Sequence, residues 1–350
     1  MYNPVPTDVR ELDECFGDFL LLRNDAAVVD CHPTAAEMVR WETSLEDIVR
    51  RVARLGYGDR IQSRHLTASD FGSSLSVAMA RVVGVDYTAA ADEVSAVVKN
   101  VTAHGVRPVE TPTLMLGDIV QADFARLLPL ATVATGDSVD VSLYAARFLI
   151  GRALILNDEA GAVATAASQL GGMAARLEAK AVAAVLNSPT TAMADGTARF
   201  VSGTNETVAT GLDVSSANEA LGLLRQQTFT GPNGFESGYV NAIAKTLLVP
   251  PSSLATAWTL NVAFGQPLRI VSNAWLDGSA AFLFADPQVA PALIRARPRA
   301  YQTPGIVQTA AVDNLPDGTE QQFDGLAMRF EHAFGIGMAS RLGVVRIPLS

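Results

Sequence analysis

One long helical pattern, which begins near Asn157 and ends before Pro189, constrains the fold of this chain more than any other feature. Asn157 or Asp158 can cap its first N–H groups, and Pro189 ends it. A helix of about 28 residues would be roughly 42 Å long, far above the usual length, so we expect it to be the spine of the fold. Apolar residues recur along it at alternating spacings of four and three, which is one helix face: Val163, Ala167, Leu170, Ala174, Leu177, Ala181 and Ala184.

The side chains of this stripe are small, so neighbouring elements can approach it closely while each contact buries little apolar area. The pair Gly171-Gly172 lies in the middle of the pattern. Each glycine costs about 1 kcal/mol relative to alanine, and the pair predicts a bend. A core helix of an ordinary enzyme would show the same pattern, so the helix alone does not identify the class of protein.

Composition excludes some classes of protein. The chain has 26 basic and 36 acidic side chains and a net charge of −10, which argues against a nucleic-acid reader with a basic patch. No run of 18 apolar residues predicts a membrane span, and residues 1–14 lack the basic start and apolar core of a signal peptide. Yet mean hydropathy is +0.22. We therefore expect the chain to hide apolar surface against copies of itself.

The rest of the chain predicts a mixture of helices and strands. Helices are expected at about 12–22, 34–55, 75–83, 216–227 and 252–264. Thr34 would cap the second, and Ser216 with Glu219 would form a capping box for the fourth. Strands are expected at 246–249 and in a hairpin of 268–276 with 280–285 across Asp277-Gly278. This mixture is typical of the α+β class.

The C-terminal part alternates with period two, which predicts a strand with one apolar face. Its apolar face would carry Leu326, Met328, Phe330 and Phe334, and its other face Ala327, Arg329 and Glu331. His332 falls on the apolar side, where we interpret it as a core histidine.

Residues 104–143 differ from their surroundings, because proline and glycine interrupt several short β-prone runs. A connection of this length is uncommon in a compact domain and usually has a role outside it. We interpret it as a long hairpin-like arm that lies mostly on a neighbouring subunit. Two ordinary strands with a long connection are the alternative.

No motif points to catalysis, and we predict no catalytic, cofactor-binding or metal-binding residue. Cys15 and Cys31 form no disulfide framework, and the pair Cys31-His32 has no second pair at zinc spacing. The segment Gly335-Ile336-Gly337-Met338 is half of a dinucleotide fingerprint, and glycines that let a strand curve explain it better. The histidines are scattered through the chain: His32, His65, His104 and His332.

Several patterns, in order over residues 65–340, resemble the major head subunit family of Mu-like tailed phages and prophages. They are His65–Phe71, Leu154–Glu159, Ala174–Glu178, Met193–Phe200, Leu247–Pro251, Phe282–Pro287 and Phe330–Gly335. The chain departs from that family where the family closes with "DxRG", since it has Ser340-Arg341-Leu342-Gly343 there. Residues 1–60 lie outside the resemblance.

The resemblance implies the tailed-phage major capsid fold, called the Johnson fold, which is of α+β class. It divides the chain into an N-terminal arm with a helix (1–64), the start of a peripheral domain (65–103), an extended loop (104–143), the peripheral domain with the spine (144–212), an axial domain (213–312) and C-terminal strands of the peripheral domain (313–350).

The function implied is structural: hexamers and pentamers of an icosahedral head around the genome, in the virion, assembled in the host cytoplasm. Implied partners are other copies, portal, scaffolding and decoration proteins, and packaged DNA, which an acidic chain would contact only non-specifically. No cofactor and no membrane are implied. The alternatives are a nanocompartment shell protein of the same fold and an α+β enzyme.

Two further expectations follow. Residues 1–60 would be kept as an arm or clamp, with the helix 34–55 on a subunit surface. Some capsids of this fold join subunits by an isopeptide bond from a lysine on the extended loop. Here that loop has Arg107 and Arg126 but no lysine, and the only lysines are Lys99, Lys180 and Lys245. We therefore expect a shell without covalent links, because a guanidinium stays protonated and cannot replace the amine.

Overall fold

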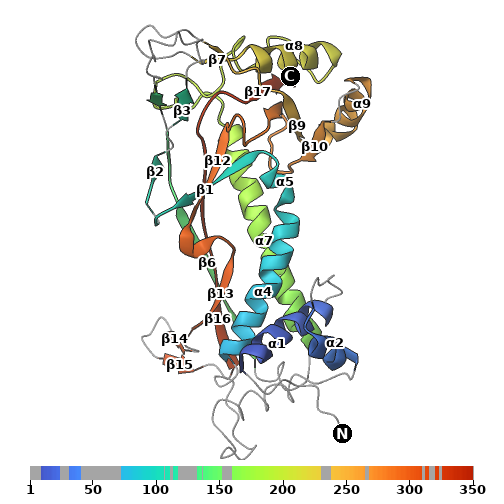
Figure 1. Cartoon of the computed structure of the whole chain (residues 1–350), viewed down its shortest axis with the longest axis vertical. Coiled ribbons are helices and arrows are strands. Elements are labelled where there is room, and N and C mark those ends of the chain that lie inside the picture. Colours follow the sequence, from blue (N-terminus) through green and yellow to red (C-terminus); the bar gives the residue numbers. More distant parts are fainter. Residues whose placement is uncertain are drawn as a thin grey trace, which may run out of the picture. The chain divides into compact units, whose positions relative to one another are not determined.

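The computed structural model describes residues 9–23, 31–40, 72–105, 107–110, 113–116, 132–135, 137–151, 160–229, 238–264, 268–309, 312–314, 320–322 and 325–349 (Figure 1). They form two compact units. The first draws on 1–90, 143–175 and 301–333, and the second on 91–142, 176–300 and 334–350. Two long elements contribute residues to both units: helix α7 (Ala160–Leu186) and strand β16 (Gly325–Met338).

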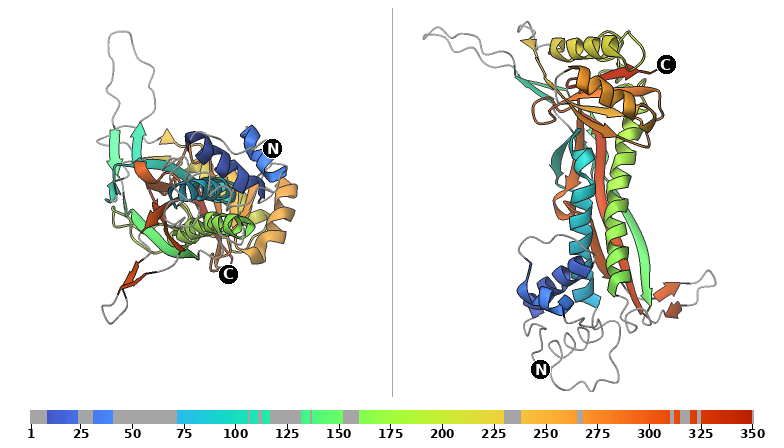
Figure 2. Two further views of the ribbon diagram at one scale, coloured as in Figure 1. Left: turned by 90° about the horizontal axis from the view of Figure 1, so that it is seen from below. Right: turned by 90° about the vertical axis from the view of Figure 1, so that its right-hand side faces the viewer.

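In the first unit, helices α1 (Val9–Arg23) and α2 (Pro33–Arg40) pack together, and α1 packs on α4 (Gly72–Ala90) (Figure 2). The helices expected at 12–22 and 75–83 are confirmed, and both are longer than expected. The predicted cap at Thr34 is wrong: α2 begins at Pro33, and the Ala35 N–H donates to the His32 carbonyl. Proline suits a first helical position, because that N–H has no helical partner. Residues 41–71, with the rest of the expected helix, lie outside the described residues.

Helix α7 is continuous through Gly171 and Gly172, and the reason for the first glycine is a close contact inside the first unit. A Cβ on Gly171 would lie 2.7 Å from the Val83 carbonyl oxygen and 3.0 Å from the Tyr87 nitrogen, both in α4. The two helices therefore meet backbone to backbone at Gly171. The expected caps Asn157 and Asp158 lie outside the described residues.

The second unit is built around a four-stranded sheet of order β10-β9-β11-β17. Its strands are β9 (Ala244–Val249), β10 (Arg269–Ser272), β11 (Ala280–Ala285) and β17 (Val344–Pro348). Strands β9 and β10 run parallel. The turn η3 (Pro251–Ser253) and helix α9 (Leu254–Phe264) form the crossover between them. The expected strand and helix at 246–249 and 252–264 are thus confirmed.

The hairpin expected from 268–276 and 280–285 is wrong. Strand β11 pairs with β9 and β17, so β9 separates it from β10. The physical reason is burial: residues 246–249 of β9 are all buried, and such a strand belongs inside a sheet. The Asn273 N–H donates to the Val249 carbonyl at the end of β10, and the chain then turns away from its neighbour.

Helix α8 (Val214–Gln226) covers β17 in the same unit. Its capping box is formed by Asp213 and Ser216, and not by Ser216 and Glu219 as expected. The Glu219 carboxylate instead accepts the N–H groups of Val208 and Ala209, at 2.7 and 3.0 Å. The expected N-cap, Ser216, lies three residues after the observed N-cap, Asp213. Aspartate is also a favoured N-cap residue, so the sequence offered both positions.

Strand β16 is buried on both faces, and this corrects the expected alternation. Ala327 and Glu331, assigned to the outer face, are buried like Phe330, and within the strand Arg329 is the exposed side chain. In the first unit β16 pairs antiparallel with β13 (Gly305–Thr309). In the second unit it pairs antiparallel with β12 (Leu293–Pro298), which runs parallel to β1 (Val98–Ala103). Strand β6 (Ser142–Gly151) also pairs with β16.

The arm region contains two antiparallel pairs. Strand β2 (Val109–Glu110) pairs with β5 (Ser138–Val139), and β3 (Thr113–Leu116) pairs with β4 (Thr132–Thr135). The hairpin-like pairing is therefore confirmed. Its base, however, belongs to the chain's own core, because Val139 and Val141 are buried with Ile294 and Ala296. The expectation that residues 104–143 lie mostly on a neighbouring subunit stays a prediction.

The remaining described elements are short. They are α5 (Asp92–Ser95), β7 (Thr228–Phe229), β8 (Gly238–Tyr239), η4 (Arg299–Tyr301), β14 (Val312–Asn314) and β15 (Glu320–Gln322). The pairs β7–β8 and β14–β15 are antiparallel. The mixture of helices with antiparallel and parallel strands confirms the α+β class.

Candidate functional site: ionic ties and assembly surfaces

The residues that the sequence offered for metal or thiol chemistry have local structural roles. Cys15 lies 3.4 Å from the Met38 sulfur, and burial raises the pKa of its thiol to about 12, so it stays protonated and inert. Cys31 donates to the His32 carbonyl oxygen, and His32 Nδ1 accepts the Thr34 N–H at 3.3 Å. Within the described ranges, no three His, Cys, Asp or Glu side chains gather as a metal site would require.

The histidines and the glycine pair near the C-terminus also have structural explanations. His332 is fully buried, and its ring meets the Tyr87 ring edge to face at 5.4 Å. His104 is exposed, and His65 lies outside the described residues. A Cβ on Gly335 would lie 2.2 Å from the Asp140 carbonyl oxygen, and one on Gly337 would lie 2.4 Å from Val139. Only glycine fits at these two positions, because Val139 and Asp140 at the base of the arm pack directly against the backbone of β16.

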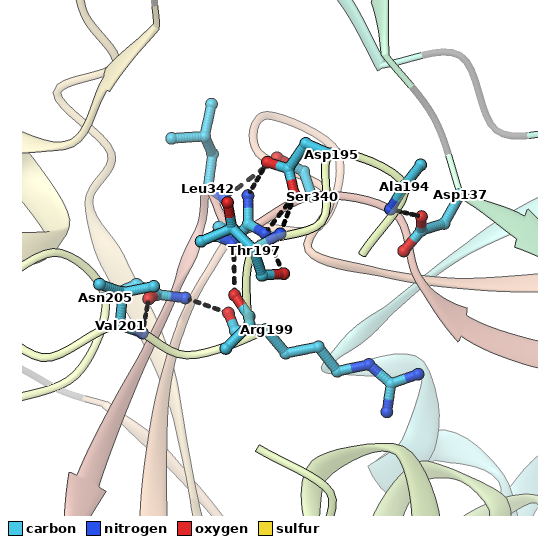
Figure 3. A network of polar contacts seen from close by, with 11 residues as sticks. Asp137, Ala194, Asp195, Thr197, Arg199, Val201, Asn205, Ser340 and Leu342 are labelled. Carbon is cyan, nitrogen blue, oxygen red and sulfur yellow. Dashed lines mark hydrogen bonds and ion pairs between the residues drawn. The ribbon is translucent and has the colours of Figure 1, made fainter. Parts of the chain in front are cut away.

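One polar network joins residues 193–200, which carried the family resemblance, to residues 340–343, where the chain departs from that family (Figure 3). Arg341 forms a bidentate ion pair with Asp195, with N–O distances of 2.5 and 2.8 Å. Its guanidinium also donates to the carbonyl oxygens of Ala198 and Thr197, each at 2.7 Å. A planar guanidinium suits this arrangement because it offers five donors in fixed directions. The segments 193–200 and 340–343 are thus held together by a single side chain.

The same network reaches the base of the arm and the loop that follows α7. Asp137 Oδ1 accepts the Ala194 N–H at 2.5 Å, directly before β5. Asn205 is fully buried, and its side chain bonds Val201 N–H and the Arg199 carbonyl, both at 2.8 Å. Figure 3 shows that these groups converge from separate segments of the second unit. These bonds fix the backbone of residues 194–201 next to the base of the arm.

A pH titration will detect the tie between Asp195 and Arg341. Arg341 holds the pKa of Asp195 well below its usual range, so the carboxylate stabilises the fold fully above its unfolded pKa of about 3.9. That contribution is lost as pH falls through the folded pKa. Because the Asp195 side chain is 48% exposed, we expect less than about 1 kcal/mol. Denaturant unfolding of wild type and Asp195→Asn should differ by a constant amount above about pH 5. The difference should shrink below about pH 4, and a gap that widens in acid would contradict the assignment.

A second ionic cluster lies entirely inside the second unit, and no sequence pattern predicted that its residues would meet. Glu178 of α7 is fully buried and pairs with Arg295 at 2.6 Å and with Arg297 at 2.9 Å, both in β12. Arg295 also donates to the side chains of Asn100 and Ser95. One signal was available in the sequence: Glu178 stands four residues after Ala174 in the helix, on a face shared with buried residues.

Burial lowers the pKa of Arg297 to about 10, which still leaves it charged at neutral pH. Glu178 therefore places one carboxylate between two buried guanidinium groups. Such a cluster is costly to break, because removing one partner of a buried ion pair weakens the compensation of the remaining charge. These ion pairs link α7 to β12, which is a structural role.

The described N-terminal helices are anchored to their own unit. Asp18 of α1 is 1% exposed, pairs with Arg81 of α4 at 2.8 Å, and accepts the His32 N–H at 2.7 Å. Arg81 donates in addition to the Glu14 carbonyl. The described part of residues 1–60 thus packs on its own chain, whereas the role of clamp between subunits stays a prediction.

Large apolar side chains are exposed on several elements of the described chain. Strand β6 is ten residues long, and it exposes the side chains of Leu143, Tyr144 and Leu149. In the second unit, Val208, Val214, Tyr239, Ile243, Trp258, Val262 and Val289 are each more than half exposed. Exposed apolar surface of this kind is typical of proteins that associate.

A family model described as phage capsid protein matches residues 134–347. Because this match covers more than half of the 350 residues, the chain belongs to the phage capsid protein family. Members of such a family are structural proteins of a virion shell and not enzymes. The resemblance to a phage head subunit is confirmed at this level, and the Mu-like subfamily stays a prediction. A search of curated protein sequences gave no match.

Three solved structures are among those that resemble the chain. The virus-like particle from Pyrococcus furiosus has 12% identity and a TM-score of 0.44, over 77% of this chain and 97% of that one. The structure of Microbacterium phage Oxtober96 has 14% identity and a TM-score of 0.45, over 74% and 90%. The capsid of cyanophage P-SCSP1u has 11% identity and a TM-score of 0.44, over 72% and 86%. The assignment to the family rests on the family match alone.

Proposed function

We propose that this chain is the major subunit of a tailed-phage head and assembles into hexamers and pentamers of an icosahedral shell around the genome. The family match over residues 134–347 carries this proposal. The Arg341 network has a structural role, because it holds segment 193–200, which carried the resemblance, against residues 340–343 through an ion pair and bonds to backbone carbonyl groups. The shell belongs to the virion and assembles in the host cytoplasm.

The proposed organisation follows the capsid fold. Residues 213–312, with the sheet β10-β9-β11, would form the axial domain, and residues 104–143 the extended loop that reaches a neighbouring subunit. Residues 1–64 would act as an arm, 65–103 and 144–212 as the peripheral domain, and 313–350 as its C-terminal strands. Portal, scaffolding and decoration proteins are the proposed partners besides other copies.

The charge of the chain sets the proposed contact with packaged DNA. A subunit with net charge −10 repels a polyanion, so contact with the genome is non-specific, weak and sensitive to salt. Of the helices that the structure describes, none is long and apolar enough to cross a membrane.

Electron microscopy of the purified full chain tests the proposal directly. We expect closed shells or rings of six and five subunits, with an electrophoretic band at the single-chain mass of 36.9 kDa. Particles that carry a co-purified enzyme in place of nucleic acid, when made in their native host, would favour a nanocompartment shell. A chain that stays monomeric under all assembly conditions would overturn the proposal.

The arm can be tested separately from the core. We expect a chain in which residues 113–135 are replaced by a short Gly-Ser linker to fold but not to form shells. Strands β2 and β5 are kept in this variant, because Val139 is part of the buried core. Circular dichroism and thermal unfolding check the fold, and sedimentation checks assembly. Aggregation of the shortened chain would show instead that the removed residues stabilise the subunit itself.

A further inference from the structure

The side chain of Gln227 is buried at the C-terminal end of helix α8, and both ends of its amide bond to one turn. Its Nε2 donates to the carbonyl oxygens of Val344 at 3.0 Å and Arg341 at 3.3 Å, and its Oε1 accepts the Gly343 N–H at 2.7 Å. An amide side chain offers two N–H donors and one oxygen acceptor, so this one is well used. Gln227 therefore holds the backbone of residues 340–343, which we call the C-terminal turn.

The C-terminal turn has little room to change its shape. Gly343 has a positive φ of 84°, and a Cβ there would lie 2.2 Å from the Ala290 carbonyl oxygen. The Gly343 carbonyl accepts the Ala285 N–H at 2.9 Å, and the Leu342 N–H donates to the Ser340 hydroxyl at 3.0 Å (Figure 3). A turn that is bonded and packed in this way moves as a whole.

The backbone of Gln227 closes the foot of the β7–β8 pair. Gln227 stands directly before β7, and Val240 follows β8 directly. The Val240 N–H donates to the Gln227 carbonyl oxygen at 2.8 Å, next to the antiparallel pairing of the two strands. One residue thus holds both the β7–β8 pair and the C-terminal turn.

On its other side, the C-terminal turn is bonded to the base of the arm. The Arg341 guanidinium pairs with Asp195, and the neighbouring Ala194 N–H donates to the carboxylate of Asp137 directly before β5 (Figure 3). A continuous series of bonds within the second unit therefore leads from the β7–β8 pair, through Gln227 and Arg341, to the arm.

Burial makes these bonds depend on one another. A buried polar group that loses its partner costs more free energy than the bond contributes, so a partly satisfied network is unfavourable. We propose that the C-terminal turn couples the β7–β8 pair to the base of the arm, so that opening at one promotes opening at the other. Coupling between two sites acts equally in both directions. It is a property of the single subunit and goes beyond the proposed function.

Hydrogen–deuterium exchange of the unassembled full chain tests the coupling. Gln227→Met keeps the length of the side chain and removes its bonds to the turn. We expect the Ala194 amide to exchange about tenfold faster, the change that loss of one hydrogen bond gives. The matched control is Glu219→Met in the same helix, whose carboxylate accepts the N–H groups of Val208 and Ala209. It should speed exchange at those two amides and leave Ala194 unchanged.

Arg341→Lys tests the reverse direction without altering the buried amide. Lysine keeps the charge but lacks the planar fork that bonds Asp195 and two carbonyl groups together. We expect faster exchange of the Val240 amide, and no further change at Ala194 when Gln227→Met is added.

Three results would overturn the coupling. They are unchanged exchange at Ala194 in Gln227→Met, effects of the two substitutions that add independently, and equal acceleration in strand β11, which would show a general loss of stability. If Gln227→Met does not fold, exchange of Val240 in Arg341→Lys decides the question. Shell formation is not part of this test, so its failure would leave the proposed function standing.

Discussion

Replacing Glu178 by glutamine will lower the free energy of unfolding by about 3–5 kcal/mol, the cost of removing one partner from a buried ion pair. Glu178 is fully buried, and its carboxylate is bonded to Arg295 and Arg297 at 2.6 and 2.9 Å. Glutamine keeps the size of the side chain but brings an NH2 group toward one of the guanidinium groups. The two guanidinium groups then lose the carboxylate that Glu178 supplies. Urea unfolding of the unassembled chain measures the loss.

Two comparisons make this result specific. Asp286→Asn removes an exposed ion pair, with Lys245, and keeps an acceptor for the Gln288 N–H, so it should cost less than about 1 kcal/mol. Combining Glu178→Gln with Arg297→Gln removes both members of one ion pair, and the double variant should be more stable than the sum of the single effects predicts. A cost for Glu178→Gln as small as that for Asp286→Asn would contradict the buried cluster.

Adding one methyl group at Gly335 will have an effect of similar size. A Cβ there would lie 2.2 Å from the Asp140 carbonyl oxygen and 3.0 Å from Val139. Backbone cannot rotate away as a flexible side chain can, so β16 and the base of the arm must separate. We expect Gly335→Ala to cost about 3 kcal/mol, at the upper end of the range for overpacking. Thermal unfolding of the subunit reports this loss.

The matched control for this variant is another strand glycine. Gly305 in β13 has no atom within 4 Å of the place where a Cβ would be. Gly305→Ala should therefore change stability by less than about 0.5 kcal/mol. Equal effects of the two substitutions would show that loss of glycine in a strand, and not the contact with Asp140, accounts for the result.

Local elements were predictable from the sequence where one face of an element is buried. The spine helix, the helix at 12–22 and the buried strand at 246–249 follow from apolar periodicity, which depends on neighbours within a few residues. Which strands lie next to each other in a sheet was not predictable in the same way. Asp277-Gly278 indicates a turn, but it does not decide whether 280–285 pairs with 268–276 or with β9. That choice depends on how completely β9 is buried, which is a property of the whole sheet.

The ionic ties were the least predictable part of the structure. Glu178 meets Arg295 across 117 residues of sequence, and Arg341 meets Asp195 across 146. No periodicity connects such positions, and a lone glutamate in an alanine-rich helix is usually a surface residue. The resemblance to a phage family picked out the segment 193–200, whereas residues 340–343 are where the chain departs from that family. The resemblance did not reveal that these two segments touch, and only the structure shows Arg341 between them.

The position of Arg341 in the sequence has a consequence for the timing of biosynthesis. The ribosome makes the arm and the loop at 193–200 long before it makes Gly335 and Arg341, and long loops close slowly. Until those residues emerge, Asp195 has no guanidinium partner and the Asp140 region has no β16 to rest on. A nascent chain therefore lacks the rigid support for its arm. The order of synthesis therefore lets these contacts within the subunit form only when the chain is nearly complete.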